Sequence, residues 1–287
     1  MIGWFTPVYL SSLSREESPK FYLISSYSGI PISAAGSNGM IHSLIGLLLQ
    51  PVSPDFYCLY VEDLIAILKA KNVGCYILSA FLAALIYADD MAILAPSLKG
   101  LCILLETCND YCYEWDICLN ARKSKLMYFG NCCTDLFVPS LNGTPIEWVE
   151  TCVYLGICLV SSKYFKCSAT DRIRKFYRCA NAIFRIEGRS DDLTMLSLVE
   201  THCLPILTYG IEIANFFDQR QRSKVRAAYN SLFRKIFGYR NFESVTDLQL
   251  SLARPTWEIL CHERETSFHH RLSRCPAESL VHLFSVL

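Results

Sequence analysis

The stretch Leu85-Ile86-Tyr87-Ala88-Asp89-Asp90-Met91-Ala92-Ile93-Leu94 places two adjacent aspartates between two short apolar runs. Two such runs around a tight acidic turn predict a β-hairpin with the carboxylates at its tip. Neighbouring carboxylates repel each other, and a divalent cation relieves that repulsion. Mg²⁺ prefers oxygen ligands and serves phosphoryl transfer, so the string favours a metal site. The alternative is a polar turn, because Asp is common in turns.

The patterns on either side of this hairpin predict an α+β region followed by an all-helical region. Helices are expected over 57–71 and, with Ser97 as the N-cap, over 98–116. Strands are expected over 125–130, 136–139, 146–149 and 153–159, and Asn142-Gly143 is expected to form a hairpin turn. Beyond residue 166 helices are expected, with a stripe of Ile173, Tyr177, Ala180 and Phe184, and then over 193–204, 218–237 and 256–273.

The string Tyr87-Ala88-Asp89-Asp90 resembles the catalytic-loop signature of reverse transcriptases. Segments 60–64, 119–125, 154–156 and 204–210 resemble, in the expected order, further motifs of the non-LTR (LINE-type) retrotransposon family. The resemblance implies a partial polymerase palm, an antiparallel sheet with helices, over 55–160 and a helical thumb-like region over 161–287. Residues 1–54 are expected to be poorly organised.

The same resemblance implies roles for single residues. Asp89 and Asp90 are expected to help hold Mg²⁺, with Mn²⁺ as the alternative ion. Lys123, or else Lys125, is expected to protonate the departing pyrophosphate, and a solvated charge is the alternative for either lysine. The implied partners are an RNA template, a DNA primer or RNA–DNA duplex, and deoxynucleoside triphosphates.

The chain also departs from the family. The family needs a third carboxylate on an earlier strand, but no Asp precedes Asp55, and Glu16 and Glu17 lie in no matching context. Pro51 follows Gln50 where the family has a glycine, and proline cannot donate a backbone hydrogen bond. We therefore expect a truncated, catalytically impaired polymerase. The alternative is a non-enzymatic nucleic-acid-binding remnant.

The charge is divided along the chain. There are 27 basic and 27 acidic residues overall, yet residues 160–240 carry 15 basic against 7 acidic side chains. The basic residues of interest are Arg172, Arg174, Lys175, Arg178, Arg220, Arg222, Lys224 and Arg226. Such a block with interleaved tyrosines is typical of a nucleic-acid-binding surface, and a solvated helix face is the alternative.

The fifteen cysteines include no Cys-x-x-Cys pair, which predicts reduced thiols in an intracellular protein, cytoplasmic or nuclear and not secreted. The group Cys261, His262, His269, His270 and Cys275 matches no common zinc spacing, so an ordinary amphipathic helix explains it better. The apolar runs 21–54 and 73–88 are interrupted or short, so no membrane partner is expected.

Overall fold

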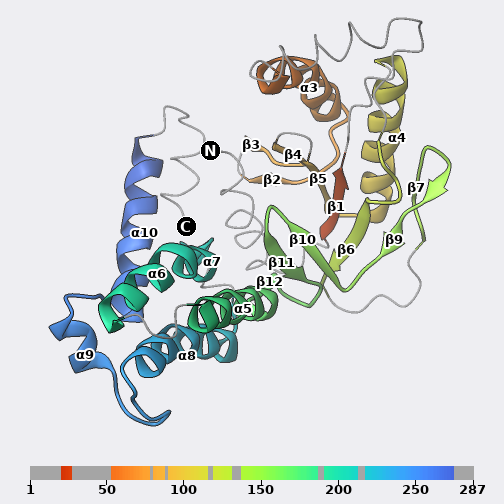
Figure 1. Cartoon of the computed structure of the whole chain (residues 1–287). Helices are drawn as coiled ribbons and strands as arrows, with labels where there is room; N and C mark the ends of the chain where they lie inside the picture. Colours follow the sequence, from red (N-terminus) through yellow and green to blue (C-terminus); the bar gives the residue numbers. More distant parts are fainter. Residues whose placement is uncertain are drawn as a thin grey trace, which may run out of the picture. The chain divides into compact units, whose positions relative to one another are not determined.

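The computed structural model describes residues 21–27, 53–77, 80–87, 90–115, 119–130, 137–186, 191–212 and 217–274. The chain divides into two compact units. The first, here called the sheet unit, comprises Met1–Leu155 and Val160–Phe165, and the second, the helical unit, comprises Gly156–Leu159 and Lys166–Leu287. The elements of both units are labelled in Figure 1. The predicted α+β class is compatible with this mixture of helices and small sheets.

The sheet unit contains a five-stranded sheet of order β4-β5-β1-β6-β9. Its strands are β4 (Ala84–Tyr87), β5 (Asp90–Ala95), β1 (Phe21–Tyr27), β6 (Lys125–Phe129) and β9 (Glu147–Trp148). Strand β1 is antiparallel to both β5 and β6, whereas β9 is parallel to β6. We did not predict β1, because its sequence lacks the period-two alternation that indicates a strand. Apart from β1 and residues 53 and 54, the segment 1–54 lies outside the described residues.

Two helices, α3 (Ser53–Ala70) and α4 (Leu98–Glu114), contact each other and build the core of the sheet unit with β5. The Oγ atom of Ser97 accepts a hydrogen bond from the amide of Gly100 at 3.1 Å, which confirms the predicted N-cap. Leu68, Leu101 and Ile93 are buried in this core. The core therefore lies directly behind the strand that begins with Asp90.

Two strand predictions need correction. Residues 137–139 are not a strand, since Pro139 has no amide to donate, and the strands are β7 (Ser140–Leu141) and β8 (Thr144–Pro145), joined by the predicted Asn142-Gly143 turn. The single strand expected over 153–159 is also wrong. Leu155 and Gly156 have φ values of 46° and 74° and divide it into β10 (Thr151–Tyr154) and β11 (Ile157–Val160).

Small additional elements complete the strands. A two-stranded sheet pairs β2 (Tyr76–Ile77) with β3 (Ala80–Phe81), where the Tyr76 and Phe81 rings meet edge to face at 5.3 Å. A three-stranded sheet has the order β10-β11-β12, with β12 spanning Lys166–Ser168. The chain passes along these strands into its helical part.

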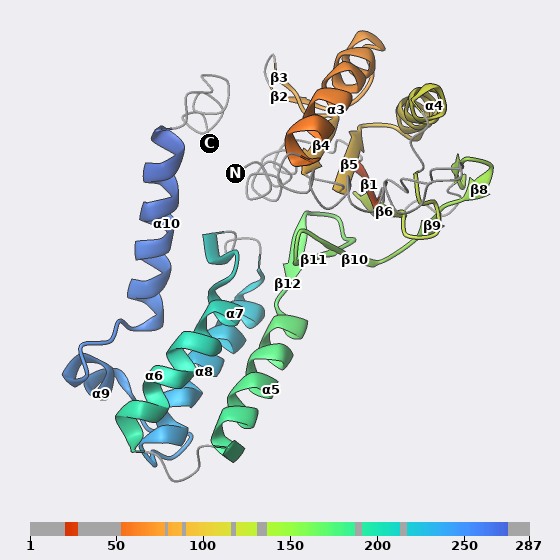
Figure 2. The same ribbon diagram turned by 45° about the horizontal axis from the view of Figure 1, so that its top comes forward.

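The helical unit contains six helices among its described residues, and Figure 2 shows their arrangement. They are α5 (Thr170–Ile186), α6 (Asp192–His202), α7 (Leu204–Thr208), α8 (Gln219–Ile236), α9 (Thr246–Ser251) and α10 (Trp257–Ser273). The predicted stripe on α5 is wrong at one position. Phe176 is fully buried, whereas Tyr177 is 39% exposed, because α6, α7 and α8 all pack against the neighbouring face.

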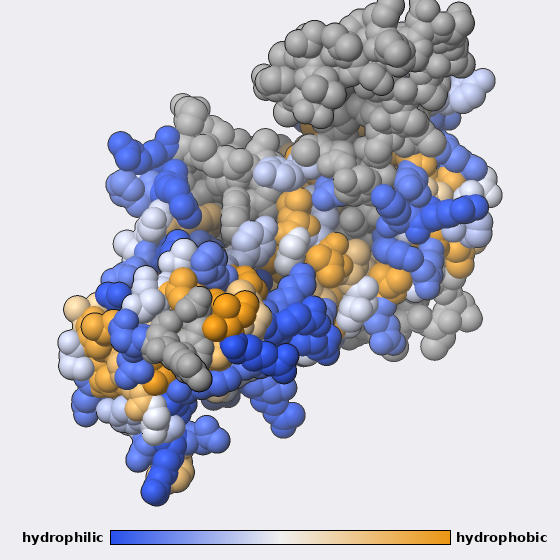
Figure 3. Space-filling model, viewed as in Figure 1, coloured by the Kyte–Doolittle hydropathy of each residue, from blue (hydrophilic) through white to orange (hydrophobic). Residues whose placement is uncertain are grey.

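Each of the ten cysteines whose side chains are described is a free thiol. Burial raises the pKa of the Cys75 thiol to about 12 and is the main reason that the pKa of Cys167 also rises to about 12. These two side chains are therefore neutral and unreactive near pH 7. Among the described helices, none combines the length and the apolar character that a membrane span requires. Figure 3 shows how polar and apolar residues are distributed over one face of the molecule.

Candidate functional site

The predicted acidic hairpin is confirmed. Strands β4 and β5 are antiparallel, and Tyr87 lies opposite Asp90. Ala88 and Asp89, which connect the two strands, lie outside the described residues. Asp90 is the first residue of β5 and is half-buried, while Tyr87 is exposed. The structure thus brings the second aspartate of the string to the end of a paired strand.

The strands that carry Asp90 are held from several directions. All residues of β5 after Asp90 are buried. The amide of Leu94 donates to the carbonyl of Ala83 at 2.7 Å, and the amide of Cys75 donates to the carbonyl of Leu94 at 3.2 Å. The Tyr154 hydroxyl donates to the carbonyl of Leu85 on β4 at 3.5 Å. These contacts fix the hairpin backbone, which is the rigidity that a metal site requires.

A third carboxylate is missing from the strand beside this hairpin. Tyr27 of β1 lies opposite Asp90 and Ser26 lies opposite Met91, and the β1 sequence Phe-Tyr-Leu-Ile-Ser-Ser-Tyr contains no acid. Among the described residues, no group of three or more His, Cys, Asp or Glu side chains could hold a metal ion. The two aspartates have the oxygen chemistry that suits Mg²⁺ or Mn²⁺, but β1 adds no ligand to them.

The two candidate lysines differ in their surroundings. Lys123 is exposed in the turn before β6, where its backbone amide donates to the side-chain oxygen of Asn120 at 3.2 Å. Lys125 is the first residue of β6, and its Nζ lies 2.5 Å from the carboxylate of Glu147. Lys125 is therefore already paired with an acid.

The eight basic candidates of the helical unit fall into two groups. Five are exposed to solvent: Arg174, Lys175 and Arg178 on α5, and Arg220 and Lys224 on α8. The other three, Arg172, Arg222 and Arg226, line a cavity of about 570 Å³, although Arg222 and Arg226 are also exposed. Arg174 is 2.8 Å from Asp171 and Arg226 is 3.2 Å from Glu258, so two of the eight have an acidic neighbour.

Helices α5 and α8 lie side by side and run in the same direction. The Ser231 hydroxyl donates to the Tyr177 hydroxyl at 3.3 Å, and one turn further Lys235 donates to Asn181 at 2.7 Å. The Lys235 ammonium also lies 4.2 Å from the centre of the Phe184 ring. By helical spacing Lys224 lies on the same stripe of α8 as Ser231 and Lys235. Basic side chains of both helices therefore border one surface, here called the α5–α8 face, defined by Arg174, Arg178, Lys224 and Lys235.

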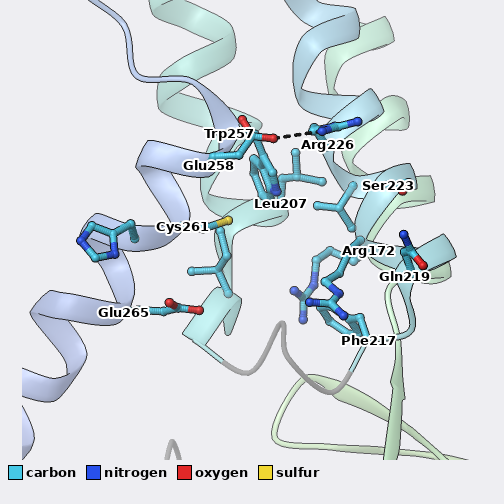
Figure 4. A pocket seen from close by; sticks show the side chains of 14 residues that line it. Arg172, Leu207, Phe217, Gln219, Ser223, Arg226, Trp257, Glu258, Cys261 and Glu265 are labelled. Carbon is cyan, nitrogen blue, oxygen red and sulfur yellow. Dashed lines mark hydrogen bonds and ion pairs between the residues drawn. The ribbon is translucent and has the colours of Figure 1, made fainter.

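The cavity is formed by the first halves of α8 and α10 (Figure 4). Gln219, Arg222, Ser223 and Arg226 line one wall, and Glu258, Cys261, His262 and Glu265 line the other. This cavity is not among the sites predicted from the sequence, although both sets have i, i+3, i+4, i+7 spacing, which marks one face of a helix. The histidines and Cys261 of the zinc hypothesis lie on α10, but the described residues form no metal group, and Cys275 falls outside them.

Comparisons with known proteins agree with the predicted resemblance. A sequence model of the family "Reverse transcriptase (RNA-dependent DNA polymerase)" matches residues 29–159. The chain is 22% identical over 237 residues, 78% of its length, to the RNA-directed DNA polymerase from mobile element jockey of Drosophila funebris. It is 24% identical over 178 residues, 59% of its length, to the protein of the same name from Drosophila melanogaster.

These findings confirm the predicted resemblance to the reverse transcriptases of non-LTR retrotransposons. The matched region 29–159 includes the acidic hairpin and Lys123. The chain spans 25% of the length of the first relative and 19% of the second. The similarity therefore concerns one part of a much longer type of protein.

Proposed function

We propose that this chain corresponds to the palm and thumb of an RNA-directed DNA polymerase of the non-LTR retrotransposon type, and that alone it is catalytically impaired. In this proposal segment 55–160 is the palm and segment 161–287 is the thumb-like region. The acidic hairpin, inside the region that the family model matches, is the observation that carries the proposal. The free thiols support an intracellular location, cytoplasmic or nuclear.

In the palm, Asp89 and Asp90 would hold Mg²⁺ or Mn²⁺, and family members in general use divalent ions. Such an ion, when bound, stabilises the negative charge of a departing pyrophosphate. Lys123 is the candidate acid that the family resemblance implies for that pyrophosphate, and Lys125, the alternative, is paired with Glu147. The absence of an acid from β1 supports impaired catalysis, because two carboxylates bind and position a metal pair less well than three.

In the thumb, the α5–α8 face would grip the phosphates of an RNA–DNA duplex. Arg178, Lys224 and Lys235 have no acidic side chain within 4.0 Å among the described residues. Arg174, the fourth cation of this face, is partly neutralised by Asp171. Lysine and arginine on an exposed face supply the salt-dependent, sequence-independent part of nucleic-acid affinity. Among the cavity-lining arginines, Arg226 is paired with Glu258 and Arg172 is partly buried, so these two are weaker candidates for this role.

Primer extension tests the palm assignment. The purified chain is incubated with an RNA template, a DNA primer, deoxynucleoside triphosphates and Mg²⁺ or Mn²⁺. We expect extension at or near background, because the third acid is missing. Template-dependent synthesis that disappears in Asp89→Ala, but persists in the exposed control Asp110→Ala on α4, would contradict the proposed impairment.

A metal-binding measurement keeps the site itself testable when no synthesis occurs. Mn²⁺ binding is followed by electron paramagnetic resonance for the wild type and for Asp90→Asn. We expect weak binding that the substitution reduces by about tenfold, since one carboxylate is removed from a two-carboxylate set. Equal binding by both proteins would show that the hairpin is only a polar turn.

The thumb assignment is tested by the salt dependence of binding to an RNA–DNA duplex. We expect the double variant Arg178→Gln, Lys224→Gln to lower the slope of log affinity against log salt by about 2, or about 1 for each phosphate that is no longer neutralised. The control Arg264→Gln changes an exposed arginine on α10 and should leave the slope unchanged. A wild-type affinity that does not depend on salt would exclude phosphate contacts.

The alternative function is nucleic-acid binding without synthesis. The α5–α8 face favours it, because that face does not depend on the incomplete acidic site. This alternative would be supported over an impaired polymerase if the chain binds the duplex and if Asp90→Asn leaves Mn²⁺ binding unchanged.

A further inference from the structure

The cavity of the helical unit contains a charged group to which no described residue is hydrogen-bonded or ion-paired. The Arg172 guanidinium points toward the hollow between α8 and α10, beside Phe217 (Figure 4). Its central carbon lies 5.4 Å from the centre of the Phe217 ring, and Phe217 is buried. Arg172 donates no hydrogen bond and forms no ion pair with any residue in the described part of the chain. Among the described residues, none therefore competes with a ligand for its five donors.

The partial burial of Arg172 favours binding of an anion. Burial lowers its pKa, and Cys167, Tyr209 and Glu212 act in the opposite direction. A guanidinium nevertheless stays charged at any ordinary pH. Removing a charge from water is costly unless a counter-charge is supplied, so an anion that enters the cavity gains more from Arg172 than from an exposed arginine.

The acidic groups around the cavity offset this positive charge only in part, since Glu212 acts on Arg172 electrostatically without forming an ion pair with it. Glu258 is engaged with Arg226 at 3.2 Å, and Glu212 has one oxygen 3.8 Å from Arg271. Figure 4 shows the Arg226–Glu258 pair at one end of the cavity and Glu265 on the wall of α10 nearer the other end. Arg172 comes from α5 and Arg222 from α8. The cavity is thus polarised, with cations on the α5 and α8 side and a carboxylate on the α10 side.

Between these charged walls the lining is apolar. Leu207, Ile211 and Trp257 contribute to it, and Gln219 and Ser223 add neutral hydrogen-bonding groups. The volume of about 570 Å³ is in the range of small-molecule sites, about 300–1,000 Å³. A ligand that matches this lining has one anionic end, a flat apolar body, and hydroxyl or amino groups that can donate to a carboxylate.

We propose that the cavity binds one nucleotide unit, with its phosphate on Arg172 and Arg222, its base against the apolar lining, and its hydroxyl or amino groups toward Glu265. Arginine pairs suit phosphate because their planar donors can bind two oxygens at once. The choice of ligand rests on the proposed nucleic-acid function of the helical unit. The same chemistry is offered by a free nucleotide and by an unstacked nucleotide of a single strand.

Calorimetric titration with AMP tests the proposal, with adenosine and inorganic phosphate as partial ligands. We expect AMP to bind about tenfold or more tightly than either part, since each part fills only half of the cavity. Arg172→Met keeps an unbranched apolar stem but removes the guanidinium donors, and it should weaken AMP binding about tenfold or more. The control Lys175→Met removes a charge from the exposed side of α5 and should leave AMP binding unchanged.

Thermal unfolding of each variant shows whether it is folded. Arg222→Met, at an exposed position of the cavity wall, is the second test if Arg172→Met does not fold, and it should weaken AMP binding about threefold or more. A lack of AMP binding by the wild type, equal binding by phosphate alone, or equal binding by folded Arg172→Met and Lys175→Met would overturn the proposal.

Two further measurements distinguish a free nucleotide from a nucleotide within a strand, and the cavity site from the thumb assignment. Displacement of AMP by a short 5′-phosphorylated oligoadenylate supports a nucleotide within a strand, and AMP binding without displacement supports a free nucleotide. Folded Arg172→Met should keep the salt slope of duplex binding. AMP binding without duplex binding would retain the cavity site and reject the thumb assignment, and the converse would do the opposite.

Discussion

The sheet unit and the helical unit assemble their candidate sites in opposite ways. Asp89 and Asp90 are consecutive in the chain, and the pairing of Tyr87 with Asp90 fixes where the second carboxylate lies. In the helical unit the basic residues come from α5 and α8, and only helix packing decides which of them share a surface. A site built from consecutive residues depends on the strand beside it, whereas a helical face depends on how each helix is rotated.

This difference affects how each site fails. The acidic hairpin itself is intact. The neighbouring strand β1 contains no acidic residue, so it provides no third carboxylate ligand. The α5–α8 face has several equivalent cations, so no single one is essential. A site made of two adjacent carboxylates is thus sensitive to the sequence of one neighbouring strand. A surface made of several cations is sensitive mainly to how its helices pack. Substitutions that disturb the packing of each unit therefore distinguish the two cases.

The rotation of α5 is tested by a pair of adjacent aromatic residues. Phe176 is fully buried, so Phe176→Ala should destabilise the helical unit by about 3–5 kcal/mol. Tyr177 is 39% exposed, so Tyr177→Ala should cost only about 1 kcal/mol, including its hydrogen bond with Ser231. Urea unfolding followed by circular dichroism measures both. Equal losses would mean that the buried face of α5 is assigned incorrectly, and with it the α5–α8 face.

The backbone that supports the hairpin is tested at Gly74. Its φ is +109°, and an added Cβ would lie 2.3 Å from the Cβ of Ala83. Gly74→Ala should therefore cost about 2–4 kcal/mol, combining backbone strain with overpacking. Gly143 also has a positive φ, of +71°, but no atom lies within 4 Å of the added Cβ, so Gly143→Ala should cost about 1 kcal/mol. Urea unfolding would refute the steric argument if the two variants lost the same stability.

The sequence predicted local features of the sheet unit well. The acidic hairpin, the Ser97 cap and the Asn142-Gly143 turn each depend on a few adjacent residues, and all three are confirmed. Strand β1 could not be predicted in the same way, because its partners β5 and β6 lie far away in the chain. Hydrogen bonds to distant strands leave no local pattern in the residues that make them.

In the helical unit the extents of the helices were predictable, but the environments of single side chains were not. Helix α8 begins at Gln219 and α10 at Trp257, each within one residue of the prediction. Pro205 does not simply end a helix, because it occupies the first turn of the short α7, where its missing amide is tolerated. Arg172 and Arg174 are both basic residues of α5, yet only Arg172 faces the cavity. Their separation follows from the packing of α5 against α6, α7 and α8, which spacing alone does not specify.

A smaller effect is expected at the N-cap of α4. Ser97→Ala removes the oxygen that accepts from the Gly100 amide, which should cost about 1 kcal/mol. The matched control Ser140→Ala lies at an exposed position of β7 and should change the free energy of unfolding by less than about 0.5 kcal/mol. Urea unfolding of the two variants compares them. A loss confined to Ser140→Ala would contradict the structural role of the cap.

The smallest expected effect concerns the ion pair that borders the cavity. Desolvation raises the pKa of Glu258, but hydrogen bonds and the Arg226 charge outweigh it, so the pKa lies below the usual value near 4.5. Because both side chains are largely exposed, Glu258→Gln should cost only about 0.2–1 kcal/mol at pH 7. A lowered carboxyl pKa adds stability that is present above pH 4.5 and is lost as the pH falls through the folded-state value.

The stability difference between wild type and Glu258→Gln should therefore shrink below pH 4.5, where protonated Glu258 no longer pairs with Arg226. The same substitution at Glu263, an exposed residue of α10 with no ion pair within 4.0 Å among the described residues, provides the control. Unfolding at about pH 7 and about pH 3.5, in low and high salt, makes the comparison. A difference that persists at low pH would assign the effect to packing of the Glu258 side chain, and the charge polarity of the cavity would then depend less on this pair.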